Sequence, residues 1–67
     1  MGKEISRRIK VIIGNRGIKY EEIGKRLGMS KQGVSWVLNH REDKDWVEKE
    51  VIAWCSVLRI ERGVIEK

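Results

Sequence analysis

The first helix that the sequence predicts is marked by apolar residues at intervals of three and four positions. This spacing places side chains on one buried stripe of a helix, and it is followed by Ile5, Ile9, Ile12 and Ile13. The helix should run from about Lys3 to Asn15 and stop at Gly17, because glycine readily takes the left-handed backbone conformation that ends many helices.

Two shorter helices joined by a tight turn should follow. The second helix should begin near Lys19 or Tyr20 and end at Gly28. The third should begin after Ser30, whose hydroxyl can accept a hydrogen bond from a free backbone N–H at the start of a helix. The inward-facing positions of this pair are Ile23, Leu27, Val34 and Val37.

A long fourth helix, from about Trp46 to Arg59, should follow the charged segment 41–45, with Asp45 as its N-cap. Its apolar arc is wider than one small core needs, and the last apolar residues indicate a short fifth helix or an extended tail. The chain has no proline, and straight-chain helix formers dominate it. We therefore predict an all-α fold, a small bundle of about five helices in a single domain over residues 1–67.

Charge is distributed unevenly along the chain. Residues 1–41 carry ten basic and three acidic side chains, a net charge of +7, whereas residues 42–67 carry five basic and seven acidic ones, a net charge of −2. A basic face beside a slightly acidic tail favours binding to a polyanion such as nucleic acid. The alternative is an ordinary solvated charged surface.

Composition excludes several other classes of protein. The longest apolar runs have three to five residues, far short of the roughly 20 that span a membrane. One cysteine, Cys55, and one histidine, His40, cannot form an internal disulfide or a four-ligand zinc site, so we expect no metal and no cofactor. The sequence also lacks a glycine-rich phosphate loop, and no catalytic constellation is evident, so we expect no enzyme and no small-molecule substrate. A cytoplasmic protein is the expectation.

Residues 20–39 resemble the helix-turn-helix of the phage Cro and repressor proteins, the Xre family. The residues that carry the resemblance are a small residue at Gly24, the turn glycine Gly28, and apolar residues at Ile23, Leu27, Met29, Val34 and Val37. The resemblance extends over roughly residues 5–60 and implies a lambda-repressor-like DNA-binding fold. The chain departs from the family at Lys19, where a capping Ser or Thr is usual, at Gly24, where Ala is commoner, and in the third helix, which carries Gly33 and Trp36.

The resemblance implies that the third helix enters the major groove of double-stranded DNA. Gln32 can then bond adenine and Lys31 can donate to guanine. The expected base contacts are Lys31, Gln32, Ser35 and Trp36. The expected backbone contacts are Tyr20, Lys25, Arg26, Ser30, Asn39 and Arg41. For Trp36 two interpretations stay open, a contact with DNA or burial under the loop at residues 41–45. The basic residues of the first helix are not counted among the contacts.

The expected function is that of a sequence-specific transcriptional regulator, a Cro-like repressor of a phage or prophage that binds a palindromic operator as a homodimer. Residues 46–67 should form the dimer interface through Trp54, Leu58, Ile60, Val64 and Ile65. The alternative for the fourth helix is that it is simply the central core helix. The competing functional hypothesis is a protein-interaction module or antitoxin built on the same helices.

Overall fold

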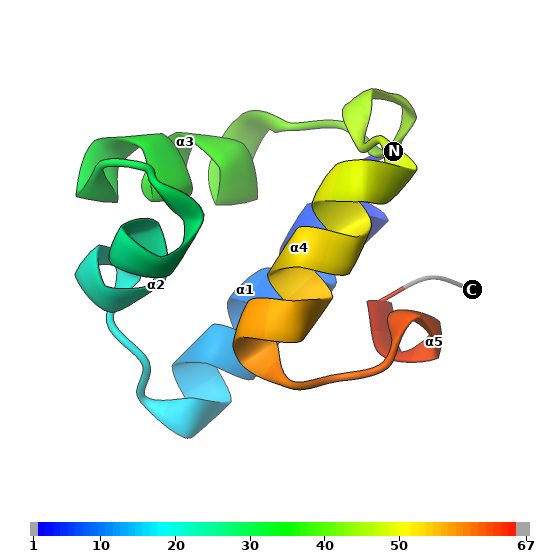
Figure 1. The fold of residues 1–67 in the computed structure, drawn as a ribbon. Coiled ribbons are helices and arrows are strands. Elements are labelled where there is room, and N and C mark those ends of the chain that lie inside the picture. The colour runs from blue at the N-terminus through cyan, green and yellow to red at the C-terminus, as the bar shows by residue number, and fades with distance from the viewer. Residues whose placement is uncertain (1, 66–67) are drawn as a thin grey trace.

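The periodic apolar stripes form helices throughout. The computed structural model describes residues 2–65 and contains, over this range, five α-helices, one short 3-10 helix and no strand (Figure 1). The elements in chain order are α1 (Glu4–Arg16), α2 (Tyr20–Leu27), α3 (Lys31–His40), η1 (Asp43–Asp45), α4 (Glu48–Leu58) and α5 (Arg62–Ile65). The all-α prediction and the expected number of helices are confirmed.

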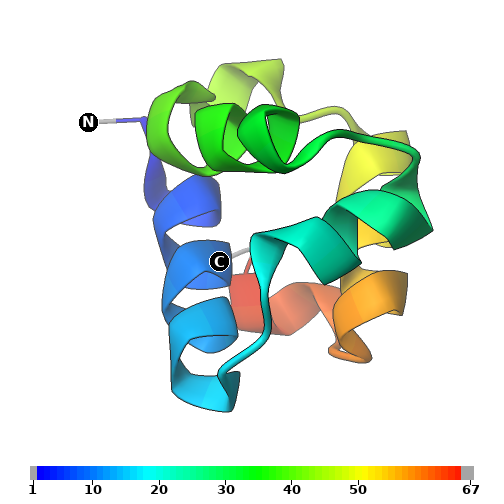
Figure 2. The same cartoon turned by 90° about the vertical axis from the view of Figure 1, so that its left-hand side faces the viewer.

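The short helix α5 closes the bundle on the side away from α3. It contacts both α1 and α4, while α2 packs against α3 and α4 (Figure 2). The N-terminal half of α1 lies beside the C-terminal end of α3, and η1 also contacts α1. This arrangement leaves the outer face of α3 uncovered by any other described element.

A single hydrophobic core contains side chains from each of the five described α-helices. Because apolar area removed from water stabilises a fold by about 25 cal/mol per Å², this shared core is the main source of stability. Trp46 and Trp54 meet edge to face within this core, with ring centroids 5.6 Å apart. The buried apolar residues are Ile9, Ile13, Ile23, Val34, Val37, Leu38, Trp46, Val51, Trp54, Cys55, Leu58 and Ile65.

The turn between α2 and α3 is built as the sequence predicts. Gly28 follows α2 with a φ of 73°, in the left-handed region, and the Ser30 hydroxyl accepts a hydrogen bond of 3.0 Å from the backbone N–H of Gly33. Gly24 meets the turn so closely that a Cβ there would lie 2.5 Å from the carbonyl oxygen of Met29. A side chain at this position would therefore require the turn to shift.

The prediction that Asp45 caps a helix starting at Trp46 is wrong. Residues 43–45 form η1, and α4 begins only at Glu48, after Val47, with no side-chain cap. The helix starts late because Trp46 is drawn into the core, where its indole N–H donates to the Ser6 hydroxyl at 2.9 Å. The capping carboxylate of the loop is that of Asp43, which accepts a 2.9 Å hydrogen bond from the N–H of Ile5 at the start of α1.

The predicted dimer interface also differs from what the structure shows. Trp54, Leu58 and Ile65 are each at most 2% exposed and belong to the core of the single chain, so they are not surface residues. Ile60 is half-buried, and Val64 is exposed. The apolar arc of α4 is wide because α2 covers one part of it and α5 another, which matches the alternative of a core helix.

None of the helices within residues 2–65 combines the length and the apolar character needed to cross a membrane.

Candidate nucleic-acid interface

The outer face of α3 carries most of the side chains expected to read DNA. Val34, Val37 and Leu38 are buried and anchor the helix. Opposite them, Lys31, Gln32 and Trp36 are exposed, as is Asn39, and Ser35 is half-buried. These side chains share one side of the helix because residues three, four and seven positions apart lie on the same face. No residue of α3 is acidic, so this face presents donors and acceptors without negative charge.

Trp36 is 57% exposed, and the interpretation that it is buried under the loop is wrong. Its ring lies against that of His40, one turn further along α3, with centroids 5.4 Å apart and planes tilted by 34°. The tryptophan that is buried next to this loop in sequence is Trp46, at 7% exposed. The rings of Trp36 and His40 therefore form an exposed pair of tilted aromatic side chains at the C-terminal end of the outer face of α3.

Asn39 is held in place by hydrogen bonds at both ends of its amide. The amide nitrogen donates to the backbone oxygen of Ser35 at 2.8 Å and to its hydroxyl at 3.3 Å. The amide oxygen accepts from the ammonium group of Lys10 at 2.6 Å. Asn39 thus joins the outer face of α3 to α1, a connection that the sequence analysis did not include.

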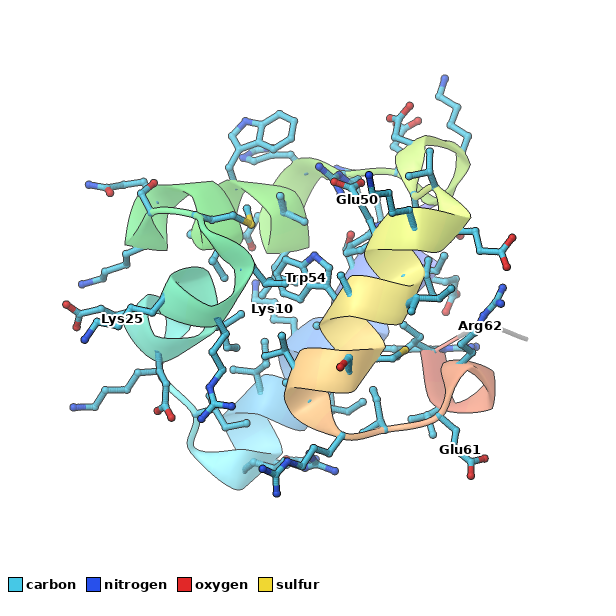
Figure 3. The ribbon with its side chains drawn as sticks, in the orientation of Figure 1. Lys10, Lys25, Glu50, Trp54, Glu61 and Arg62 are labelled. Carbon is cyan, nitrogen blue, oxygen red and sulfur yellow. The ribbon has the colours of Figure 1, made fainter. Side chains whose placement is uncertain are left out.

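Arg41 does not offer the free guanidinium expected of a backbone contact. It forms an ion pair with Glu50 of α4, which faces the end of α3 (Figure 3). The guanidinium also lies 5.0 Å from the ring centroid of Trp46, a cation–π arrangement. With its side chain only 19% exposed, Arg41 fastens the loop to α4 instead of facing outward.

The other predicted backbone contacts remain on the surface around the turn. Lys25 and Arg26 are exposed on α2, and Lys25 lies at the edge of the molecule away from α4 and α5 (Figure 3). Arg26 approaches Glu22 only at 3.9 Å, an exposed pair worth little. Tyr20 is half-buried in the first turn of α2, and the hydroxyl of Ser30 is engaged in its cap.

Nine basic side chains have no carboxylate partner within residues 2–65. The ion pairs in this range engage Arg8, Arg26, Arg41, Lys44 and Arg62. The basic residues outside these ion pairs are Lys3, Arg7, Lys10, Arg16, Lys19, Lys25, Lys31, Lys49 and Arg59, of which Arg16 donates to the backbone oxygen of Leu58. Lys3, Arg7 and Lys10 are not among the expected DNA contacts, although their spacing of four and three along the sequence places them on one helical face.

Comparisons with known proteins do not identify a function for this chain. Comparison with models of protein families, with curated protein sequences and with solved structures gave no significant match. The function has to be inferred from the side chains that the fold places on α3 and around it.

Proposed function

We propose that the protein is a sequence-specific transcriptional regulator that binds double-stranded DNA, in the manner of the Cro and repressor proteins it resembles. The observation that carries the proposal is the outer face of α3, where exposed polar side chains without negative charge stand opposite a buried apolar face. An α-helix of this kind fits the major groove of B-DNA, and its polar side chains can reach base edges there.

Each side chain of this face has a chemical role in the proposal. Gln32 bonds the N6 and N7 atoms of adenine with its amide, and Lys31 donates to the O6 and N7 atoms of guanine. Ser35 lies deeper and serves mainly to hold Asn39. Trp36, flat and exposed, suits contact with the methyl group of thymine. The starts of α2 and α3, near Tyr20 and Ser30, suit the phosphates because backbone N–H groups at helix N-termini attract anions.

The proposal includes a homodimer on a palindromic operator, acting as a repressor in the cytoplasm. A single groove helix contacts only a few base pairs, and regulators of this type gain specificity from two half-sites one helical turn apart. Since most of the expected interface residues lie in the core, pairing has to use side chains that stay accessible, such as Val64 and Ile60.

The test is selection of bound sequences from random duplex DNA. The proposal predicts enrichment of a two-fold symmetric consensus, with an affinity that falls steeply as salt rises, because phosphate contacts release counterions. Recovery of unrelated sequences, or of none, would contradict sequence-specific recognition.

A protein-interaction module is the second candidate, and one observation favours it. An apolar hollow lies between the α2–α3 turn and α4, lined mainly by Leu27, Met29, Val47, Ala53 and Trp54, and Val47 is 55% exposed beside it. A protein that acts only through this hollow would still attract DNA weakly at low salt through its net charge of +5, but it would enrich no consensus from random duplex DNA. The same selection therefore separates the two functions.

A further inference from the structure

We propose that α1 provides a second phosphate-binding surface, which holds a DNA backbone beside the C-terminal end of α3. This surface consists of Lys3, Arg7 and Lys10 and is called the α1 stripe below. The inference rests on the proposed DNA binding and deepens it, because it assigns a DNA-binding role to α1, which lies outside the helix-turn-helix of α2 and α3.

The three side chains of the α1 stripe lie on one face of the molecule. Lys3 immediately precedes α1, and its carbonyl oxygen accepts the N–H of Arg7 at 3.0 Å, so it continues the helical repeat. Lys10 follows one turn after Arg7, and all three side chains are exposed. Together with Leu38 and Asn39 of α3 they line a shallow hollow between the two helices. The cations therefore surround a concave site instead of pointing in separate directions.

The α1 stripe is continuous with the face of α3 proposed to read bases. The ammonium group of Lys10 donates to Asn39 at 2.6 Å, and Asn39 in turn donates to Ser35. Asn39 follows Gln32 by two helical turns and so shares its face. A DNA strand that leaves the major groove at the end of α3 would meet Asn39 and then Lys10.

The positive charges of the α1 stripe are not neutralised within residues 2–65, where the one side-chain bond described for the stripe runs from Lys10 to the neutral amide of Asn39. Arg8, the neighbour of Arg7, pairs with Glu4 at 3.5 Å and donates to the backbone oxygen of Ile65 at 3.4 Å, which ties α5 to α1. No carboxylate of the described range pairs with the α1 stripe itself. Like charges three and four residues apart on a helix repel each other, and a row of phosphates would relieve that repulsion.

The test compares two double variants that each remove two positive charges. Arg7→Gln with Lys10→Gln neutralises the α1 stripe, and Lys44→Gln with Lys49→Gln is the matched control on exposed residues of η1 and α4. Binding to a mixed-sequence duplex of about 20 base pairs is measured between about 50 and 200 mM salt. Two lost phosphate contacts should reduce the slope of log K against log salt by about 1.8, so wild type loses about tenfold more affinity than this variant over that range. The control should keep the wild-type slope.

The outcomes separate this inference from the proposed function. Equal slopes for the two double variants would overturn the role of the α1 stripe while leaving DNA binding in place, whereas wild-type protein that binds no duplex would overturn both. The variant Arg7→Lys with Lys10→Arg keeps the charge and should keep the slope. Ethylation of single phosphates on DNA selected by the wild type adds a measurement that needs no variant. Interference at phosphates beyond the bases read by α3 is expected, and its absence would contradict the inference.

Discussion

Replacing Ser6 by alanine is expected to destabilise the protein far more than the loss of one hydroxyl at the surface would. Ser6 is 1% exposed, and its hydroxyl joins three parts of the chain. It accepts the indole N–H of Trp46 at 2.9 Å, and it lies 2.8 Å from the carbonyl oxygen of Arg41 and 3.2 Å from that of Val37. These contacts hold α1 against the C-terminal end of α3 and the loop that follows it.

The magnitude follows from what the substitution leaves unpaired. A hydroxyl has one proton, so Ser6 donates to one carbonyl at a time, and the shorter distance favours that of Arg41. The carbonyl of Val37 also accepts the N–H of Arg41 at 3.1 Å and keeps that bond. The variant therefore leaves the indole N–H of Trp46 and one carbonyl without their partner, at about 1–3 kcal/mol each. Alanine is the better helix former and offsets a few tenths of a kcal/mol. The expected loss is about 2–5 kcal/mol.

Urea unfolding followed by tryptophan fluorescence measures this loss. A chain of this length has a total stability of about 3–10 kcal/mol, so the urea midpoint should fall markedly. The melting temperature should drop by about 10 °C or more, since each kcal/mol lost lowers it by about 4–8 °C in a domain of this size. Ser56→Ala, on the exposed side of α4, is the matched control and should change stability by less than about 0.5 kcal/mol. If Ser6→Ala unfolds at the same urea concentration as Ser56→Ala, the hydroxyl does not hold these segments together.

Three further predictions concern the reading face, the turn and the C-terminal helix. Gln32→Ala should relax sequence preference at one base pair in each half-site, at a cost of about 1–3 kcal/mol, and an equal loss on all sequences would place its contact on the DNA backbone. Gly24→Ala should lower the melting temperature, because the added Cβ would lie 2.5 Å from a backbone carbonyl oxygen of the turn. In the control variant Gly14→Ala, the added Cβ has no atom within 4 Å, and the substitution should stabilise α1 by about 0.5–1 kcal/mol. Ile65→Asp buries an unpaired carboxylate and should lower the free energy of unfolding by about 3 kcal/mol or more. Val64→Asp should fold normally and weaken any self-association that sedimentation detects for the wild type. Unchanged self-association of Val64→Asp would refute a role of Val64 in pairing.

Apolar periodicity and local capping signals are enough to predict the parts of this protein that depend on neighbours along the chain. The bounds of α1, α2 and α3 follow from apolar periodicity and from local signals at Gly17, Gly28 and Ser30, where backbone conformation and capping involve only residues within one turn. The polar face of α3 follows for the same reason, because the residues opposite a buried stripe have to face outward.

Which element covers which face of a helix cannot be predicted from these signals, because it depends on packing between segments far apart along the chain. Periodicity identifies the apolar side of a helix but not the element that packs on it. For this reason the sequence predicts a dimer interface at Trp54, Leu58 and Ile65, although these residues lie in the core of the single chain. For the same reason, periodicity does not predict hydrogen bonds and ion pairs between residues far apart along the chain. Asp43 accepts a hydrogen bond from the N–H of Ile5, 38 residues earlier, at the start of α1. Arg41 forms an ion pair with Glu50, and Lys10 donates to Asn39, 29 residues later. Each of these contacts forms because burial of the shared core brings separate segments together, and that is a property of the folded chain as a whole.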